Sequence, residues 1–204
     1  MIKNVIFDFG QVLVRFDPKY MTETFVKDEK DSLLLQNVLF DRLYWDRLDL
    51  GTISDAELIS EACKRLPERL HKSASDIYNS WIYNIPENEG MCELVSELKE
   101  NFGAKLFLLS NISRSFSEHS SEIPILKFFD KCIMSACYGV VKPSREIFDI
   151  LCRECEIKKE ESIFIDDSEK NVRGACEYGI SAYLFDGDTE RLKKYLFDLL
   201  SKQK

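Results

Sequence analysis

The sequence predicts an α/β fold in which a parallel β-sheet is covered by helices on both faces, and two patterns indicate it. Five short apolar runs have the length and composition of buried strands. They are residues 4–9, 104–111, 131–135, 162–167 and 181–185. Helical patterns separate the later runs, so strands and helices alternate through the second half of the chain. This alternation is typical of a Rossmann-like, three-layer core.

The helical stretches of the second half follow from apolar residues spaced three and four apart. They cover residues 91–102, 145–155, 169–179 and 189–200. Gly103 and Gly179 stand where a helix C-terminus favours a left-handed residue before the next strand begins.

One segment interrupts the alternation directly after the first strand. Helical patterns occupy residues 19–28, 32–50, 53–66 and 73–85, and no clear strand lies among them. Ser54 and Glu57, in the sequence S-D-A-E, form a capping box that predicts a helix start. We therefore expect an α/β core made of residues 1–15 and 89–204, with a small helical domain, residues 16–88, inserted after the first strand.

Composition limits the classes of partner. The chain has 204 residues, of which 45% are hydrophobic and 31% charged, with a net charge of −8. An acidic protein is a poor partner for nucleic acid or an anionic membrane, because both attract clusters of Lys and Arg. No apolar run approaches the roughly 20 residues that span a bilayer. We expect a cytoplasmic protein, and the sequence leaves its oligomeric state open.

The cysteines give little sign of a metal or redox site. Cys152 and Cys155 have C-x-x-C spacing, but no second pair and no histidine cluster completes a zinc site. Both lie inside a helical pattern, so we interpret them as thiols in or near the core.

Polar residues follow four of the predicted strands. In open parallel sheets, ligands bind outside the carboxyl ends of the strands, so these side chains are candidates for one site. They are Asp8, Ser110 and Asn111, Lys142 in a loop after the third strand, and Asp166 with Asp167.

Such a set suits phosphate chemistry. Carboxylates that share one edge repel each other, and a hard divalent cation such as Mg²⁺, which prefers oxygen ligands, removes this cost. An ionised aspartate can attack phosphorus to give an aspartyl-phosphate. A metal ion and the Lys142 ammonium would neutralise charge on the transferring group.

Four motifs in order carry a family resemblance. Residues 8–12 read D-F-G-Q-V, the strand LFLLS ends on Ser110, Lys142 precedes Pro143, and three residues separate Asp166-Asp167 from Asn171. The chain thereby resembles the haloacid dehalogenase superfamily from end to end. It is most similar to bacterial glucose-1-phosphatase-like enzymes, and more distantly to the N-terminal phosphatase of epoxide hydrolases.

The resemblance implies a role for each of these residues. Asp8 would be the nucleophile, Ser110 and Asn111 would bind phosphate, and Lys142 would contact both phosphate and nucleophile. The family's metal ligands correspond here to Asp8, the carbonyl of Gly10 and Asp167, with Asp166 nearby or acting through water. The helical insert would be a cap of the C1 type. We expect a turn at Lys142-Pro143 that directs the ammonium inward.

The implied activity is Mg²⁺-dependent hydrolysis of a small phosphomonoester, such as a hexose 1-phosphate, through an aspartyl-phosphate. Gly10 departs from the usual pattern, because most phosphatases of the superfamily have there a second aspartate that protonates the leaving oxygen. A replacement would have to come from the cap, where residues 44–47 (Tyr44, Trp45, Asp46 and Arg47) are candidates, although packing also explains them.

Two other functions stay open. A chain without this acid could be a non-catalytic binder or regulator that recognises a phosphorylated metabolite. A metal-free haloacid dehalogenase would also use Asp8, but the acid pair Asp166-Asp167 has no purpose in a metal-free site.

Overall fold

A computed structural model, describing residues 1–201, contains one sheet of five parallel strands in the order β3-β2-β1-β4-β5. All five predicted strands are present, and the α/β fold is confirmed. The strands are β1 (Asn4–Phe7), β2 (Lys105–Ser110), β3 (Lys131–Met134), β4 (Ser162–Asp166) and β5 (Ser181–Leu184).

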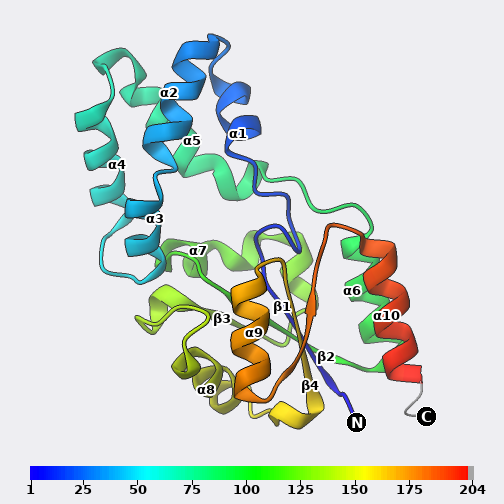
Figure 1. Ribbon diagram of the computed structural model, residues 1–204. Coiled ribbons are helices and arrows are strands. Elements are labelled where there is room, and N and C mark those ends of the chain that lie inside the picture. The colour runs from blue at the N-terminus through cyan, green and yellow to red at the C-terminus, as the bar shows by residue number, and fades with distance from the viewer. Residues whose placement is uncertain (202–204) are drawn as a thin grey trace.

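Helices cover both faces of the sheet (Figure 1). Alternate side chains of β1 point to opposite faces, so Val5 and Phe7 share one hydrophobic cluster with α6 (Met91–Phe102) and α10 (Thr189–Ser201). Ile6 belongs to the other cluster, with α8 (Arg145–Glu154) and α9 (Glu169–Tyr178). The central strand is therefore buried on both sides, as a parallel sheet requires. Gly103 and Gly179 end α6 and α9 in the left-handed conformation, as predicted.

Five helices follow β1 and gather beyond the carboxyl ends of the strands (Figure 1). They are α1 (Pro18–Phe25), α2 (Glu29–Leu39), α3 (Arg42–Asp49), α4 (Asp55–Arg65) and α5 (His71–Asn84). The predicted capping box begins α4. The stretch 32–50, expected as one helical run, is divided, because the Asp41 carboxylate accepts a hydrogen bond from Leu43 N and starts α3 as a new helix.

Shorter elements complete the described chain. They are α7 (Arg114–His119) and the 3₁₀ segments η1 (Glu68–Leu70), η2 (Ser120–Glu122), η3 (Pro124–Phe128), η4 (Ser135–Cys137) and η5 (Lys159–Glu161).

Two connections join the helical group to the sheet, and they run side by side. Val14 and Glu87 form an antiparallel bridge, and Arg15 N donates to Pro86 O at 2.8 Å. The Asn88 amide donates to Val12 O at 2.8 Å, in the loop that follows β1. One buried hydrophobic cluster continues from the sheet into the helical group. The division at residues 16 and 88 stays a prediction.

The register of the sheet places the strand-end residues together. Phe7 of β1 lies beside Leu108 of β2 and Ile165 of β4. Asp8 therefore follows β1 at the level where β4 ends on Asp166. Since all strands are parallel, their carboxyl ends share the edge that faces the helical group.

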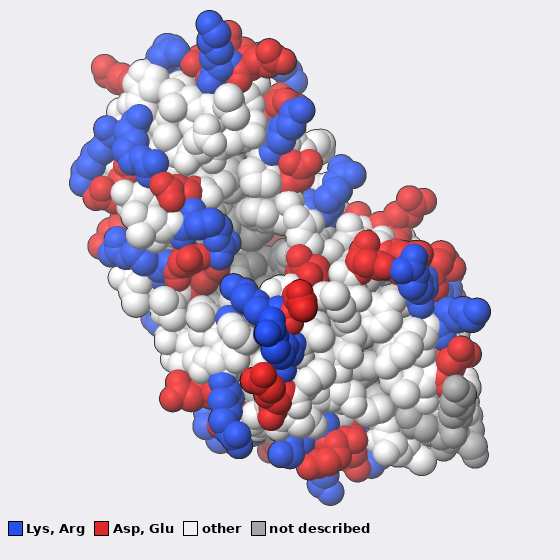
Figure 2. All heavy atoms as spheres, in the orientation of Figure 1, with Lys and Arg blue, Asp and Glu red and all other residues white. Residues whose placement is uncertain are grey.

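The surface has no large region of a single charge on the face shown in Figure 2, where acidic and basic side chains are mixed. That face is hollowed where the helical group meets the sheet-containing part. Among residues 1–201, every helix is too short or too polar to cross a bilayer.

A close contact between α9 and Pro143 supports the Lys142-Pro143 turn. A Cβ at Gly174 of α9 would lie 2.7 Å from Pro143 Cβ and 2.9 Å from Pro143 O. We expect Gly174→Ala to destabilise the fold by about 1–3 kcal/mol, because overpacking exceeds the roughly 1 kcal/mol that Ala gains in a helix. Urea unfolding measures this change.

Gly10→Ala is the matched control, because a Cβ there meets nothing within 4 Å. We expect it to leave stability nearly unchanged. A Gly174→Ala protein as stable as the wild type would contradict the close approach.

Candidate active site

A buried lysine joins the ends of two strands. The Lys142 ammonium lies 2.8 Å from Asp8 Oδ1 and 2.7 Å from Asp166 Oδ2, and the lysine is only 2% exposed. These two short distances show that the ammonium points inward, as expected. The Lys142-Pro143 peptide is cis.

Asn111 holds the backbone of this lysine. Its carbonyl oxygen accepts from Lys142 N at 2.8 Å, and its amide donates to Lys142 O at 3.1 Å. The side chain that the family resemblance implies for phosphate binding is thus used to position Lys142. Direct contact of Asn111 with phosphate stays a prediction.

Asp166 is enclosed by hydrogen-bond donors. Oδ1 accepts from Ser168 N at 2.8 Å, Oδ2 accepts from Lys142, and the Asn171 amide reaches both oxygens at 3.1 Å. Asp166 is fully buried, so these bonds compensate for the loss of water. Ser168 N and the Asn171 amide thus fix the Asp166 carboxylate beside the Lys142 ammonium, which favours an indirect role for Asp166 toward a metal ion.

Asp8 occupies the carboxyl end of the central strand. Its Oδ1 accepts from Phe9 N at 2.7 Å as well as from Lys142. Burial raises the pKa of Asp8 to about 6, while Lys142 and a hydrogen bond from Ser110 oppose the rise. Burial also disfavours the charge of Lys142, but Asp8 and Asp166 outweigh it and raise the pKa of the ammonium. Lys142 is therefore protonated at neutral pH.

The acidic residues fit a divalent cation. Asp8, Asp166 and Asp167 each offer a carboxylate oxygen, and these oxygens lie within 4.8 Å of one another. Lys142 compensates only part of their negative charge, and Asp167 is exposed enough to accept a ligand. Hard oxygen donors in this number suit Mg²⁺ better than a soft metal.

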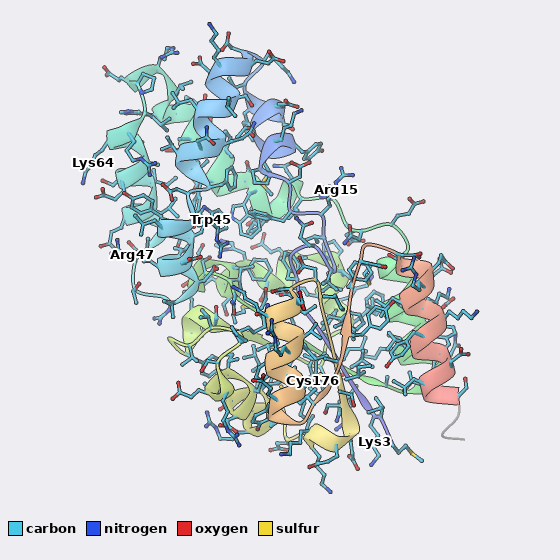
Figure 3. The ribbon with its side chains drawn as sticks, viewed as in Figure 1. Lys3, Arg15, Trp45, Arg47, Lys64 and Cys176 are labelled. Carbon is cyan, nitrogen blue, oxygen red and sulfur yellow. The ribbon has the colours of Figure 1, made fainter. Side chains whose placement is uncertain are left out.

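A cavity of about 160 Å³ lies between the strand ends and the helical group. Its walls are formed by Phe9, Gly10, Gln11, Phe16, Arg42, Trp45, Asp49, Trp81, Ser110, Asn111 and Ile112. The rings of Trp45 and Trp81 pack edge-on at 6.0 Å, and Figure 3 shows Trp45 on the side of the helical group that faces the sheet. The helices therefore give this cavity aromatic rings together with two charged residues, Arg42 and Asp49, and the strand ends give it Ser110 and Asn111.

Gly10 faces open space, so no atom of residues 1–201 fills the place of the missing side chain. The neighbouring Gln11 amide donates to Phe16 O and is already engaged. Among the cap candidates, Trp45 lines the cavity, whereas Asp46 pairs with Arg42 and Arg47 is exposed. Neither Asp46 nor Arg47 is among the described residues of the cavity wall.

Asp49 is the residue that sequence reasoning missed. This last residue of α3 lines the cavity and is 7% exposed. Burial raises its pKa to about 7, where Arg42 lowers it and Asp46 raises it further. A signal was present, because Trp45, Leu48 and Asp49 occupy the buried face of α3 at helical spacing, and an acid on that face is unusual.

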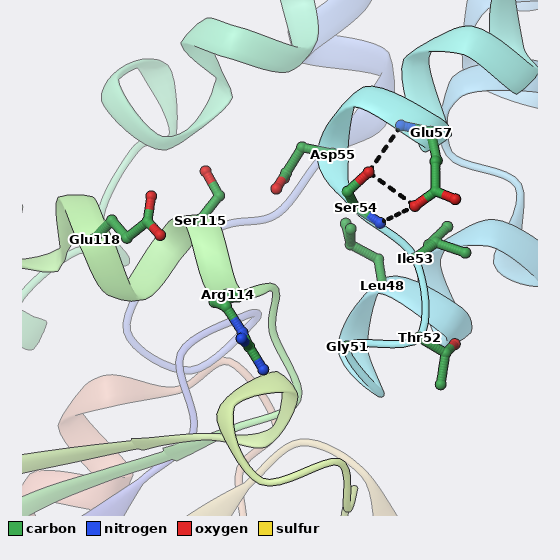
Figure 4. A pocket seen from close by; sticks show the side chains of 10 residues that line it. All are labelled: Leu48, Gly51, Thr52, Ile53, Ser54, Asp55, Glu57, Arg114, Ser115 and Glu118. Carbon is green, nitrogen blue, oxygen red and sulfur yellow. Dashed lines mark hydrogen bonds between the residues drawn. The ribbon is translucent and has the colours of Figure 1, made fainter.

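A second cavity, of about 360 Å³, lies between the start of α4 and α7 (Figure 4). Ser54 and Glu57 in its wall are occupied by the capping box, and Arg114 donates to Ala136 O. Its polar groups therefore serve local structure, and they do not converge as the groups around Lys142 do.

Comparison with known proteins identifies the family. The family model for haloacid dehalogenase-like hydrolases matches residues 2–179. The chain belongs to this family. A D-ribitol-5-phosphate phosphatase from Bacteroides thetaiotaomicron is 26% identical over 90% of this chain and 91% of its own.

Solved structures share the fold. A family enzyme from B. thetaiotaomicron, in complex with magnesium and inorganic phosphate, has a TM-score of 0.71 at 24% identity, covering 94% of this chain and 99% of its own. The L-2-haloacid dehalogenase of Xanthobacter autotrophicus has a TM-score of 0.67 at 18% identity, covering 89% of this chain and 76% of its own. At these identities, the likeness concerns the fold.

The arrangement around Lys142 predicts a large and pH-dependent cost for its removal. Lys142→Met leaves the Asp8 and Asp166 carboxylates buried without their cation, which costs about 3–5 kcal/mol. Burial already raises the pKa of Asp8 and Lys142 opposes the rise, so without Lys142 the Asp8 carboxyl binds a proton still more readily in the folded state than in the unfolded state, and the deficit grows as pH rises. Urea unfolding in EDTA at about pH 5.5 and about pH 8 tests this dependence.

Lys72→Met is the control, because Lys72 pairs with Asp76 on the surface and is 85% exposed. We expect less than about 1 kcal/mol from it. Equal effects of the two substitutions would contradict a buried, charge-compensating Lys142.

Replacement of Asp49 should change stability with the opposite pH dependence to replacement of Lys142. Its folded-state pKa lies above its unfolded value, so the native wild type retains a proton that the unfolded chain releases, and stability falls as pH rises toward about 7. Asp49→Asn has no carboxyl group to titrate here, so it does not lose stability in this way. The melting temperature of Asp49→Asn minus that of the wild type should therefore become more positive, by a few degrees, between about pH 5 and about pH 8. A constant difference across this range would contradict the buried environment of Asp49.

Proposed function

We propose that the protein is a Mg²⁺-dependent phosphatase that hydrolyses a small phosphomonoester. One observation carries the proposal: Lys142 holds Asp8 at the carboxyl end of the central strand, beside two further carboxylates. A site built only to bind an anion has no use for this density of negative charge. A metal-dependent phosphoryl transfer uses all of it.

The chain's own residues supply most of the chemistry. An Asp8 carboxylate oxygen attacks phosphorus, the bond to the leaving oxygen breaks, and water then hydrolyses the aspartyl-phosphate. Ser110 and the Lys142 ammonium hold phosphate oxygens beside Asp8. Mg²⁺, held by Asp8, Asp167 and the carbonyl of Gly10, would supply the positive charge that the transferring group needs. Asp166 keeps Lys142 in place.

The cavity is consistent with a small, partly polar substrate. Its volume of about 160 Å³ suits a compact molecule, and Arg42 in its wall adds a second cation near the phosphate site. The relative that hydrolyses D-ribitol 5-phosphate supports a sugar or sugar-alcohol phosphate. Hexose 1-phosphates remain candidates of the same class, and we expect such a metabolite enzyme to act in the cytoplasm.

The test is phosphate release from a panel of esters, with Mg²⁺ and with EDTA. The panel contains D-ribitol 5-phosphate, D-glucose 1-phosphate and 4-nitrophenyl phosphate. We expect release with Mg²⁺, its loss in EDTA, and a fall of at least about 10³-fold in Asp8→Asn, because the nucleophile is gone. Asp76→Asn, a change of the same kind on the surface of α5, should behave as wild type.

The second candidate function rests on Gly10, because a site without a proton donor there could bind a phosphorylated metabolite without cleaving it. No release from any ester, together with a rise in melting temperature on adding D-ribitol 5-phosphate, would favour the binder. Release that is equal with Mg²⁺ and EDTA would contradict the metal-dependent phosphatase.

A further inference from the structure

Hydrolysis of an alkyl phosphate leaves one proton unaccounted for. The alkoxide that departs from phosphorus is a strong base and must be protonated as it leaves. Gly10 has no side chain, and Lys142 already donates to Asp8 and Asp166. Among the described residues of the cavity wall, Arg42 and Asp49 are the ionisable ones, and an arginine does not release its proton in proteins.

Asp49 is held in place by the sheet as well as by its own helix. Its backbone carbonyl accepts from the Ser135 hydroxyl at 2.6 Å, and the same hydroxyl accepts from Ile112 N at 2.9 Å. Ile112 follows Ser110 and Asn111 directly. The end of α3 is therefore tied to the loop that carries the proposed phosphate ligand.

The carboxyl group of Asp49 is available for chemistry. Within residues 1–201, its side chain makes no hydrogen bond and no ion pair, and the residue lines the cavity while being more than nine-tenths buried. Its oxygens are not among the fully enclosed, unpaired atoms of the described chain. They therefore keep some exposure and are free to contact a molecule in the cavity.

The charges around Asp49 are balanced. Arg42 of its own helix and Lys142 of the strand-end cluster favour the carboxylate, whereas Asp46 and Asp8 favour the neutral acid. Burial is the largest influence and raises the pKa of Asp49 to about 7. Near neutral pH the group therefore exists in both forms, which suits an acid that must later act as a base.

We propose that Asp49, supplied by the helical cap, is the general acid and base that takes the place of the side chain missing at Gly10. This inference rests on the proposed phosphatase function.

In the first step, an oxygen of Asp8 forms a bond to phosphorus while the bond from phosphorus to the substrate oxygen breaks. That oxygen receives the proton of the neutral Asp49 carboxyl group and leaves as an alcohol. In the second step, the Asp49 carboxylate takes a proton from water as the water oxygen attacks phosphorus. The bond to Asp8 breaks, inorganic phosphate is released, and Asp8 and Asp49 return to their starting states.

The decisive comparison uses two kinds of substrate, sugar esters and an aryl ester, which differ in their need for an acid. D-ribitol 5-phosphate and D-glucose 1-phosphate release alkoxides, whereas 4-nitrophenyl phosphate releases a stable phenolate. We expect Asp49→Asn to lower kcat/KM for the sugar esters by about 10²–10⁴-fold and to change kcat/KM for the aryl ester by less than about threefold. This parameter reports the first chemical step, in which the acid acts.

Asp76→Asn is the control for loss of a carboxylate from the cap, because Asp76 lies on the surface of α5 and pairs with Lys72. Asp76→Asn should leave kcat/KM unchanged for the sugar esters and for the aryl ester. Asp8→Asn should abolish both reactions, which separates the nucleophile from the acid.

The pH profile of the wild type tests the proposal without relying on any variant. For the sugar esters, kcat/KM should fall about tenfold per unit above about pH 7, as Asp49 loses its proton. This alkaline limb should be absent for 4-nitrophenyl phosphate.

Several results would overturn the proposal. Equal losses on both substrates in Asp49→Asn would make Asp49 a structural or binding residue, and no loss on either would exclude it. A wild type active on the aryl ester alone would show that no acid operates. A wild type inactive on every ester would reject the phosphatase itself, and this outcome is distinguishable from the other three.

Discussion

The structure depends on one buried ion cluster, in which the Lys142 ammonium lies between the carboxylates of Asp8 and Asp166. Placing such charges out of water costs several kcal/mol per ion unless each is paired and hydrogen-bonded. The surrounding chain meets this requirement. The Asn171 amide and Ser168 N complete the bonding of Asp166, and Asn111 fixes the backbone of Lys142. The close approach of α9 at Gly174 supports the Lys142-Pro143 turn. The parallel sheet makes the cluster possible, because it brings the ends of β1 and β4 to one level.

The helical group adds what the sheet edge lacks. Its aromatic residues close one side of the cavity, Arg42 adds a cation, and Asp49 adds an acid in a buried position. The proposed catalytic groups are therefore shared between two parts of the structure. The sheet edge holds the nucleophile and the charges that bind phosphate, and the helices hold the group that handles the leaving oxygen. The tie from Ser135 to Asp49 O connects the two sides.

The sequence was sufficient to predict the strands, the α/β class and the cluster at the strand ends, because buried parallel strands are short apolar runs and polar residues at their ends are conspicuous. The inward direction of Lys142 was expected from the family resemblance, because it implies a turn at Lys142-Pro143 and a lysine that contacts the nucleophile. The positioning role of Asn111 was not predictable, since it depends on how two loops meet. Helical spacing placed Asp49 on the buried face of α3, but its position over the cavity follows from contacts far apart in the sequence. The division of residues 32–50 into two helices depended on a single cap at Asp41, which a periodic pattern does not reveal.

The central claim is that Asp8 is the nucleophile of a phosphoryl-transfer reaction, and trapping the intermediate tests it most directly. The wild type would be mixed with Mg²⁺ and 4-nitrophenyl phosphate, quenched in acid within the first turnover, digested and examined by mass spectrometry. The account predicts a phosphoryl group on the peptide that contains Asp8, on that residue, and none in Asp8→Asn. Release of nitrophenol with the Asp8 peptide unmodified, or with the phosphoryl group on another residue, would contradict it.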